Sequence, residues 1–265
     1  MVRKTELIHG NCHCGRFRFE LHDIDLDAVT FCDCTLCKKQ GCIWLTPAAI
    51  HITRDDGVLV RYHSQTLVQD FCAICGTVVQ GEHLSGPLVG IQSVNLRNLR
   101  GINPFEYDIR KDCMPANSAV CLPLKGSCHC GKVVVELLQP IEQLVIKEDN
   151  CSICTRNAFI GVYPSQSQVV LTGAEHMRDY RFGKKYNGSP FCRTCGVHVC
   201  LNLYGPPQSV VDTMSDEKKA YVKKMLDLKP LNIRIFDHID MQGLKIERCD
   251  EGQVGYDTEV LGLSP

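Results

Sequence analysis

Cysteine motifs recur in the same order in the two halves of the chain. Each half carries Gly-x-Cys-His-Cys-Gly, then Cys-x-x-Cys, then Phe-Cys-x-x-Cys-Gly, at residues 10–15 and 126–131, 34–37 and 151–154, and 71–76 and 191–196. The offset stays between 116 residues, from Cys12 to Cys128, and 120 residues, from Cys72 to Cys192. Repetition at one spacing indicates duplication of a structural unit. We therefore predict two domains, residues 1–122 and 123–265.

Later landmarks indicate an insertion in the second half. The segment 84–87, Leu-Ser-Gly-Pro, is matched 119 residues later by Leu-Tyr-Gly-Pro, whereas Asn95-Leu-Arg97 is matched 137 residues later by Asn-Ile-Arg. The difference between the two offsets places 18 additional residues between Pro206 and Leu231.

Residues 215–228, within this insertion, have the signals of a helix. Ser215 can cap it, Asp216 and Glu217 suit its first turn, and Pro230 would stop it. The apolar residues of this segment fall on one helical stripe: Tyr221, Val222, Met225, Leu226 and Leu228.

The other segments are mostly typical of strands. Five runs alternate in polarity or are rich in β-branched residues, at 16–21, 58–62, 132–137, 168–172 and 230–236. The Asn and Arg of each Asn-x-Arg would then lie on one face of a strand and form hydrogen bonds within the β core. The predicted fold class is mainly β, with one helical addition in the second unit.

Composition narrows the function classes. Hydrophobic residues make up 44% and charged residues 22%, which is typical of a globular protein. A formal net charge of -1 disfavours a general nucleic-acid binder. No run of apolar residues is long enough to cross a membrane, and the first ten residues lack the apolar core of a secretory signal. We therefore expect a cytoplasmic protein. The sequence carries no signal of its oligomeric state.

The 18 cysteines are best interpreted as metal ligands, because thiols at short spacings in a reducing compartment rarely form disulfides. In each unit the Cys-x-Cys pair and the distant Cys-x-x-Cys-Gly pair provide four thiolates, the full shell of a structural zinc ion. Disulfides or a redox-active Cys-x-x-Cys are the alternative. The two predicted structural zinc sites are Cys12, Cys14, Cys72 and Cys75, and Cys128, Cys130, Cys192 and Cys195.

A third cluster, Cys32, Cys34 and Cys37, predicts reactivity. Three protein ligands leave one position of a zinc ion open to water or substrate, as in catalytic zinc sites. A histidine or Cys42 as fourth ligand would instead close the site. The adjacent Lys38 and Lys39 would offset the charge of the thiolates, hold an anionic substrate, or form a solvated basic run.

The second unit departs from this pattern, because Asp149 aligns with Cys32. Asp149, Cys151 and Cys154 could hold zinc through one oxygen and two sulfurs. The simpler reading is that this copy has lost its reactive metal. Among the histidines, His13 and His129 should point away from the metal between their paired cysteines, and we expect His83 and His198 to be satisfied non-ligands.

The three cysteine motifs, followed by Asn-x-Arg, resemble the glutathione-dependent formaldehyde-activating enzyme and centromere protein V family, twice over. The resemblance implies several small coiled β-sheets in each unit. It implies structural zinc at Cys12, Cys14, Cys72 and Cys75, and a zinc site implicated in catalysis at Cys32, Cys34 and Cys37. It also implies reversible addition of the glutathione thiol to formaldehyde, a carbon-sulfur lyase chemistry.

Three functional hypotheses follow. The first is a zinc-dependent lyase acting on a glutathione or other thiol adduct, or on another small electrophile, with the reactive zinc in the first domain. The second is a zinc enzyme of different chemistry, with a bulkier small molecule bound between the domains. The third is a non-catalytic zinc scaffold or interaction module. A basic tail would favour this hypothesis, and the sequence has none.

Overall fold

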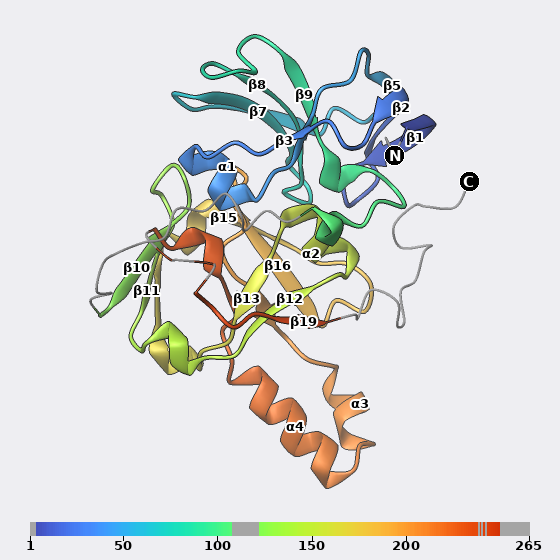
Figure 1. Cartoon of the computed structure of the whole chain (residues 1–265). Helices are drawn as coiled ribbons and strands as arrows, with labels where there is room; N and C mark the ends of the chain where they lie inside the picture. Colours follow the sequence, from blue (N-terminus) through green and yellow to red (C-terminus); the bar gives the residue numbers. More distant parts are fainter. Residues whose placement is uncertain (1–3, 108–121, 238, 240, 242, 250–265) are drawn as a thin grey trace.

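The computed structural model describes residues 4–107 and 122–249, apart from 238, 240 and 242. No helix in these ranges is long and apolar enough to cross a membrane. In Figure 1 the first unit lies above the second, and the helices of the insertion extend below both. The predicted fold class is confirmed: the chain is mainly β, built from several small sheets with a helical addition in the second unit. The division at residues 122 and 123 stays a prediction.

The first unit contains two sheets in its described part. The three-stranded sheet has the order β1 (Lys4–Asn11), β2 (Phe17–Asp25) and β5 (His51–Asp55). The six-stranded sheet has the order β3 (Val29–Thr30), β4 (Trp44–Leu45), β9 (Gln92–Asn95), β8 (Val78–His83), β7 (Leu67–Cys72) and β6 (Leu59–His63). The helical elements are α1 (Thr35–Gln40), η1 (Leu96–Asn98) and η2 (Pro104–Glu106).

The described part of the second unit contains three sheets. Their strand orders are β10 (Leu124–Ser127), β11 (Val134–Leu137), β14 (Val169–Thr172); β18 (Leu231–Asn232), β13 (Ile160–Val162), β12 (Ile146–Asp149), β19 (Glu247–Cys249); and β15 (Met177–Tyr180), β16 (Asn187–Cys192), β17 (Asn202–Leu203). The helices are α2 (Ser152–Asn157), α3 (Gln208–Asp212) and α4 (Asp216–Leu226). Short 3-10 turns are η4 (Ile141–Gln143), η5 (Gln166–Gln168), η6 (Ala174–His176) and η7 (Ile233–Ile235).

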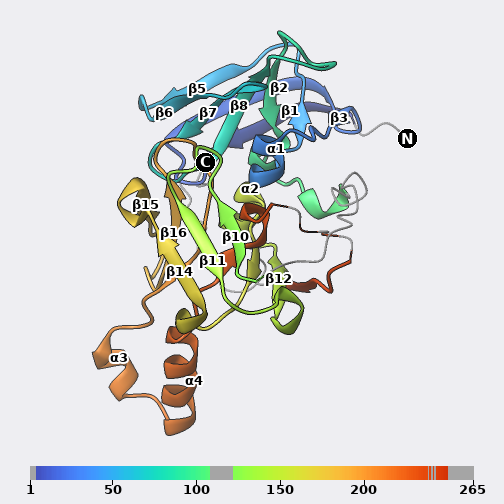
Figure 2. The same ribbon diagram turned by 90° about the vertical axis from the view of Figure 1, so that its left-hand side faces the viewer.

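The insertion forms the predicted helix, but its apolar stripe is not buried. Ser215 caps α4 by accepting a hydrogen bond from the backbone N–H of Lys218. No side chain of α4 is fully buried, and Tyr221 is 64% exposed. The helix is tied to the rest of the unit at its C-terminal end, where Gln166 donates to the Leu226 carbonyl. Figures 1 and 2 both show α3 and α4 extending away from the sheets.

The Asn-x-Arg motifs leave their strands at the Asn, so the predicted shared strand face was wrong, whereas the predicted hydrogen bonds of Asn95 and Asn232 within the buried core are confirmed. Asn95 ends β9, and its side chain accepts a hydrogen bond from the Arg97 N–H to open the 3-10 turn η1. Asn232 does the same for Arg234 in η7. The Asn side chain competes with the sheet ladder for the backbone N–H, which is why the strand stops there. Four of the five predicted strand runs are present, and the fifth ends at Asn232.

The two units pack on each other in a reciprocal way. Arg97 donates to the carbonyl of Gly41 in its own unit and to that of Thr155 in the other. Arg234 donates to the equivalent carbonyls, those of Ala158 and Lys38. Each arginine therefore joins the end of the short helix of its own unit to that of the other unit, so the arrangement resembles a symmetric dimer within one chain.

The largest buried cluster crosses from one unit to the other. It includes Trp44 and Phe71 from the first unit and Phe191 and Ile233 from the second. The rings of Phe71 and Phe191 meet edge to face, with centroids 6.4 Å apart. Aromatic pairs at this distance add to the free energy of burial. The contact between the units is thus part of the hydrophobic core.

We predict that Gly76→Ala destabilises this contact. Gly76 has φ +74°, and a Cβ there would lie 2.5 Å from His198 Nε2 and 2.6 Å from Phe191 Cγ. The matched control is Gly131→Ala, which has φ +75° but nothing within 4 Å of the added Cβ. The control should lose about 1 kcal/mol of unfolding free energy, because alanine is unfavourable in the left-handed backbone conformation. Gly76→Ala should lose clearly more, as measured by denaturant unfolding. Equal losses would contradict the steric argument.

Candidate metal centres

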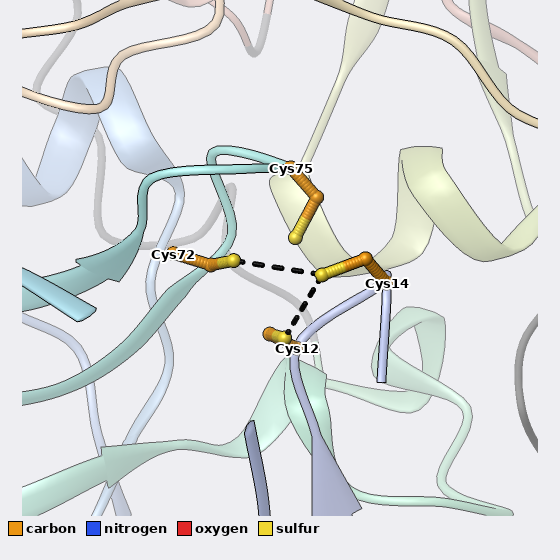
Figure 3. A group of neighbouring side chains, drawn as sticks. All are labelled: Cys12, Cys14, Cys72 and Cys75. Atoms are coloured by element: carbon orange, nitrogen blue, oxygen red, sulfur yellow. Dashed lines mark hydrogen bonds between the residues drawn. The ribbon is translucent and has the colours of Figure 1, made fainter. Parts of the chain in front are cut away.

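Four thiols converge in the first unit. Cys12 and Cys14 follow β1, while Cys72 ends β7 and Cys75 closes the next turn, and Figure 3 shows their sulfur atoms pointing at one another. The Sγ atoms of Cys12 and Cys14, and those of Cys14 and Cys72, are 3.6 Å apart. Tetrahedral zinc with bonds of about 2.3 Å sets sulfur atoms about 3.8 Å apart. The spacing and the donor set fit a four-thiolate zinc site.

The second unit repeats this cluster. Cys128 and Cys130 have Sγ atoms 3.5 Å apart, as do Cys130 and Cys192, and Cys195 completes the group. The hydrogen bond with Cys195 lowers the pKa of Cys130 to about 6, whereas that with Cys192 raises the pKa of Cys128 to about 12. A metal ion would replace these shared protons, because the thiolate is the metal ligand. All the described cysteines are free thiols.

The third predicted group also comes together. Cys32 lies before α1, Cys34 is the N-cap of α1, and Cys37 is in its first turn. The backbone N–H of Cys37 donates to the Cys34 sulfur at 3.4 Å. Hydrogen bonds from the Cys32 and Cys37 thiols, and this backbone bond, lower the pKa of Cys34. Cys32 and Cys34 are half-buried, so the cluster stays accessible on one side.

Two side chains from the six-stranded sheet border this group. Trp44 Nε1 donates to the Cys37 sulfur at 3.1 Å. A ring nitrogen of His83 lies within 4.8 Å of the sulfur atoms of Cys32 and Cys37. His83 is buried, neither of its nitrogens has a hydrogen-bond partner in the described structure, and burial lowers its pKa. It is therefore a neutral imidazole beside the thiols.

The equivalent group in the second unit is Asp149, Cys151 and Cys154, whose ligand atoms also lie within 4.8 Å of one another. The Cys151 and Cys154 sulfur atoms are 3.0 Å apart. One carboxylate and two thiols at this spacing have the donor set of an oxygen-and-sulfur metal site. Cys249 on β19 pairs with Asp149 in parallel register and is half-buried.

Lys39 does not face the thiols. It is 6% exposed, and its Nζ donates to the carbonyls of Ser127 and Ile235 and pairs with Asp237, 2.9 Å away. These partners all belong to the second unit, so Lys39 joins the units. Only the exposed Lys38 of this pair is left to interact with solvent or an anion.

The histidines between paired cysteines point away from the sulfur atoms, as predicted, and reach the other unit. His13 Nε2 is hydrogen-bonded to Ser152 at 2.6 Å, and its Nδ1 to Tyr180 at 2.9 Å. His129 is hydrogen-bonded to Thr35 and Tyr62, the residues at equivalent positions in the first unit. Burial lowers the pKa of His13 to about 3, which keeps it neutral.

Sequence reasoning missed two features of the third group. His83 was expected to be a satisfied non-ligand, but it lies beside Cys32 and Cys37, and its ring nitrogens have no hydrogen-bond partner among the residues that the structure describes. Trp44 is the single tryptophan of the chain, and its position soon after the cysteines gave no sign of a hydrogen bond to sulfur. His83 is distant from Cys32 in the sequence, so only the fold brings it to the thiols.

Comparison with known proteins identifies the family. The model of the glutathione-dependent formaldehyde-activating enzyme family matches residues 7–109 and again 123–225. The chain therefore belongs to that family and carries two copies of its domain.

Two individual proteins are similar over about half of the chain. A Halomonas elongata protein named "Putative glutathione-dependent formaldehyde-activating enzyme" is 28% identical over 144 residues, covering 49% of this chain and 87% of that protein. A crystal structure of a Rhodobacter sphaeroides protein is 24% identical and covers 46% of this chain and 98% of its own, with a TM-score of 0.34.

We predict that the two four-thiol clusters need metal for stability. Structural zinc contributes about 10 kcal/mol or more of binding free energy per site at neutral pH, comparable to the whole stability of a domain. A strong chelator under reducing conditions should therefore unfold the chain, as measured by circular dichroism. Zinc should restore the signal and magnesium should not, since thiolates are soft ligands. An unchanged melting temperature after chelation would contradict this assignment.

Proposed function

We propose that this chain is a zinc-dependent enzyme of the carbon-sulfur lyase class, acting on an adduct of glutathione or another thiol, or on a related small electrophile. The reactive centre is the group of Cys32, Cys34 and Cys37 in the first unit. The observation that carries the proposal is that these three thiols are joined by hydrogen bonds and two of them are half-buried. The two four-thiol groups, in contrast, have complete shells. Membership of the family supports the same chemistry.

Each residue of this centre has a definable task. Cys32, Cys34 and Cys37 would hold zinc, and zinc when bound supplies thiol activation by stabilising the thiolate form. The Cys37 N–H holds the Cys34 sulfur at the N-terminus of α1. The Trp44 N–H fixes the Cys37 sulfur and takes up part of its negative charge. These two bonds set the directions of two of the three ligands.

The four-thiol groups have a structural task in this proposal. Cys12, Cys14, Cys72 and Cys75, and likewise Cys128, Cys130, Cys192 and Cys195, would enclose zinc completely. A full shell leaves no position for substrate. Free thiols in all the described cysteines support a reducing compartment, and we propose the cytoplasm.

A second candidate is an enzyme for a bulkier molecule bound between the units. A cavity of about 450 Å³ is lined by Ala73 of the first unit and by Arg178, Phe191 and Arg193 of the second. The two arginines would suit an anionic ligand. The lining contains none of the reactive cysteines, so this cavity favours binding more than catalysis.

The decisive variant is Cys34→Ser. Serine is a good N-cap and can accept the same hydrogen bond from the Cys37 N–H, so α1 should form normally. It is a poor zinc ligand, so turnover of glutathione with formaldehyde, measured as an excess over the uncatalysed rate, should fall at least about a hundredfold. The melting temperature should stay close to that of the unaltered chain.

The matched control is Cys151→Ser, which changes the equivalent N-cap of α2 in the second unit. Turnover should stay within about twofold if only the first unit is reactive. Full activity in Cys34→Ser would reject the assignment of the reactive centre. A wild-type rate no faster than the uncatalysed one would reject glutathione and formaldehyde as substrates.

A further inference from the structure

We propose that His83 is the fourth ligand of the first unit's reactive centre, which is then a three-cysteine, one-histidine site in the resting protein. The inference rests on the proposed function, because it concerns the position that a substrate thiol would use. The imidazole would occupy the coordination position that the three cysteines leave open. A substrate thiol can bind there only by replacing the imidazole.

The position of His83 is the first support. A ring nitrogen lies within 4.8 Å of the sulfur atoms of both Cys32 and Cys37. Tetrahedral zinc with usual bond lengths would set nitrogen and sulfur ligands about 3.6 Å apart. The imidazole therefore needs only a limited approach to complete the shell. The group that meets this limit is Cys32, Cys37 and His83, and Cys34 joins it through hydrogen bonds to the Cys32 and Cys37 thiols. Cys42, the other candidate for a fourth ligand, is buried and lies outside this group.

The missing hydrogen bonds of His83 are the second support. The side chain is buried, 3% exposed, yet neither Nδ1 nor Nε2 has a hydrogen-bond partner within residues 4–107 and the described part of the second unit. Buried polar groups are almost always paired, and one left unpaired costs free energy. By contrast, His13 is also a buried histidine of the first unit, and both of its ring nitrogens have hydrogen-bond partners. A metal ion at the three thiols would give one His83 nitrogen its partner.

The packing around His83 holds its ring in place. Trp44 meets the imidazole edge to face, with centroids 5.4 Å apart and planes at 86°. The same Trp44 donates to the Cys37 sulfur, so one side chain positions two members of the proposed shell. His83 ends β8, where it pairs with Leu67 of β7. A rigid ring on a sheet is a suitable support for a ligand.

The second unit gives an internal comparison. There Leu203 occupies the place of His83 by strand pairing, one residue from its match with Leu84 in the sequence. Leu203 pairs with Asn187 as His83 pairs with Leu67, and both partners lie five residues before the first cysteine of the following Cys-x-x-Cys pair. The same unit has Asp149 in place of Cys32. The two neighbours in the proposed shell, Cys32 and His83, therefore differ together between the copies. This joint difference is expected if they serve one metal.

The experiment compares the unaltered chain with His83→Leu, which copies the second unit. Both are loaded with cobalt(II), whose visible spectrum depends on the number of sulfur and nitrogen ligands. Loss of a nitrogen ligand should change the difference spectrum and lower the affinity of one metal per chain at least about tenfold in chelator competition. The control is His63→Leu, an exposed histidine in β6 of the same sheet, which should change neither quantity.

An identical spectrum and affinity in His83→Leu would overturn the proposal. If that variant does not fold, the intact chain is labelled with ¹⁵N-histidine and loaded with cadmium. One histidine ring nitrogen should then show coupling to the metal, and the absence of any such coupling would equally overturn it. Both readouts are independent of turnover, so failure of the proposed reaction and failure of the histidine assignment give different results.

Discussion

The hydrogen bonds of His13 and His129 are the interactions on which the arrangement of the two units depends. Each histidine lies between two cysteines of a four-thiol group, and each is bonded to the first residue of the short helix in the opposite unit, Ser152 or Thr35. The turn between two cysteines of a four-thiol group thereby fixes the start of the other unit's short helix, at whose start the cysteines of the third or the equivalent group lie. Hydrogen bonds across the interface therefore connect the four-thiol groups with the starts of the helices that carry the other cysteine groups.

The interface is symmetric in its hydrogen bonds but not at its centre. The helix α1 ends at Gly41 and α2 ends at Ala158, both in the left-handed conformation. A Cβ at Gly41 would overlap with the Cβ of Ala158. Only one of the two equivalent positions can carry a side chain, and the chain places alanine in the second unit despite its cost in this conformation. Two identical copies with alanine at both positions could not approach this closely.

The sequence predicted the features that depend on short spacings. The Cys-x-Cys and Cys-x-x-Cys pairs and the Ser215 cap involve residues a few positions apart, where backbone geometry limits the outcome. The tandem units were visible because these short motifs recur in the same order. Features that depend on distant contacts escaped it. The buried position of Lys39 requires hydrogen bonds to two carbonyls that lie 88 and 196 residues away in the chain. The turn after Asn95 depends on competition between side chain and sheet, which hydrophobic alternation does not record.

The contacts of α2 show how the second copy can differ in its cysteine set and still support the first unit. In the second unit, Ser152, Thr155 and Arg156 of α2 still make the bonds to the first unit, to His13, Arg97 and Asn11, although Asp149 replaces a cysteine just before the helix. None of these bonds uses the thiols of Cys151 or Cys154. The four-thiol groups, in contrast, hold the turns that present His13 and His129. Covalent linkage keeps the two units at a high effective concentration, so the second copy can continue to support α1 of the first after its own cysteine set has diverged.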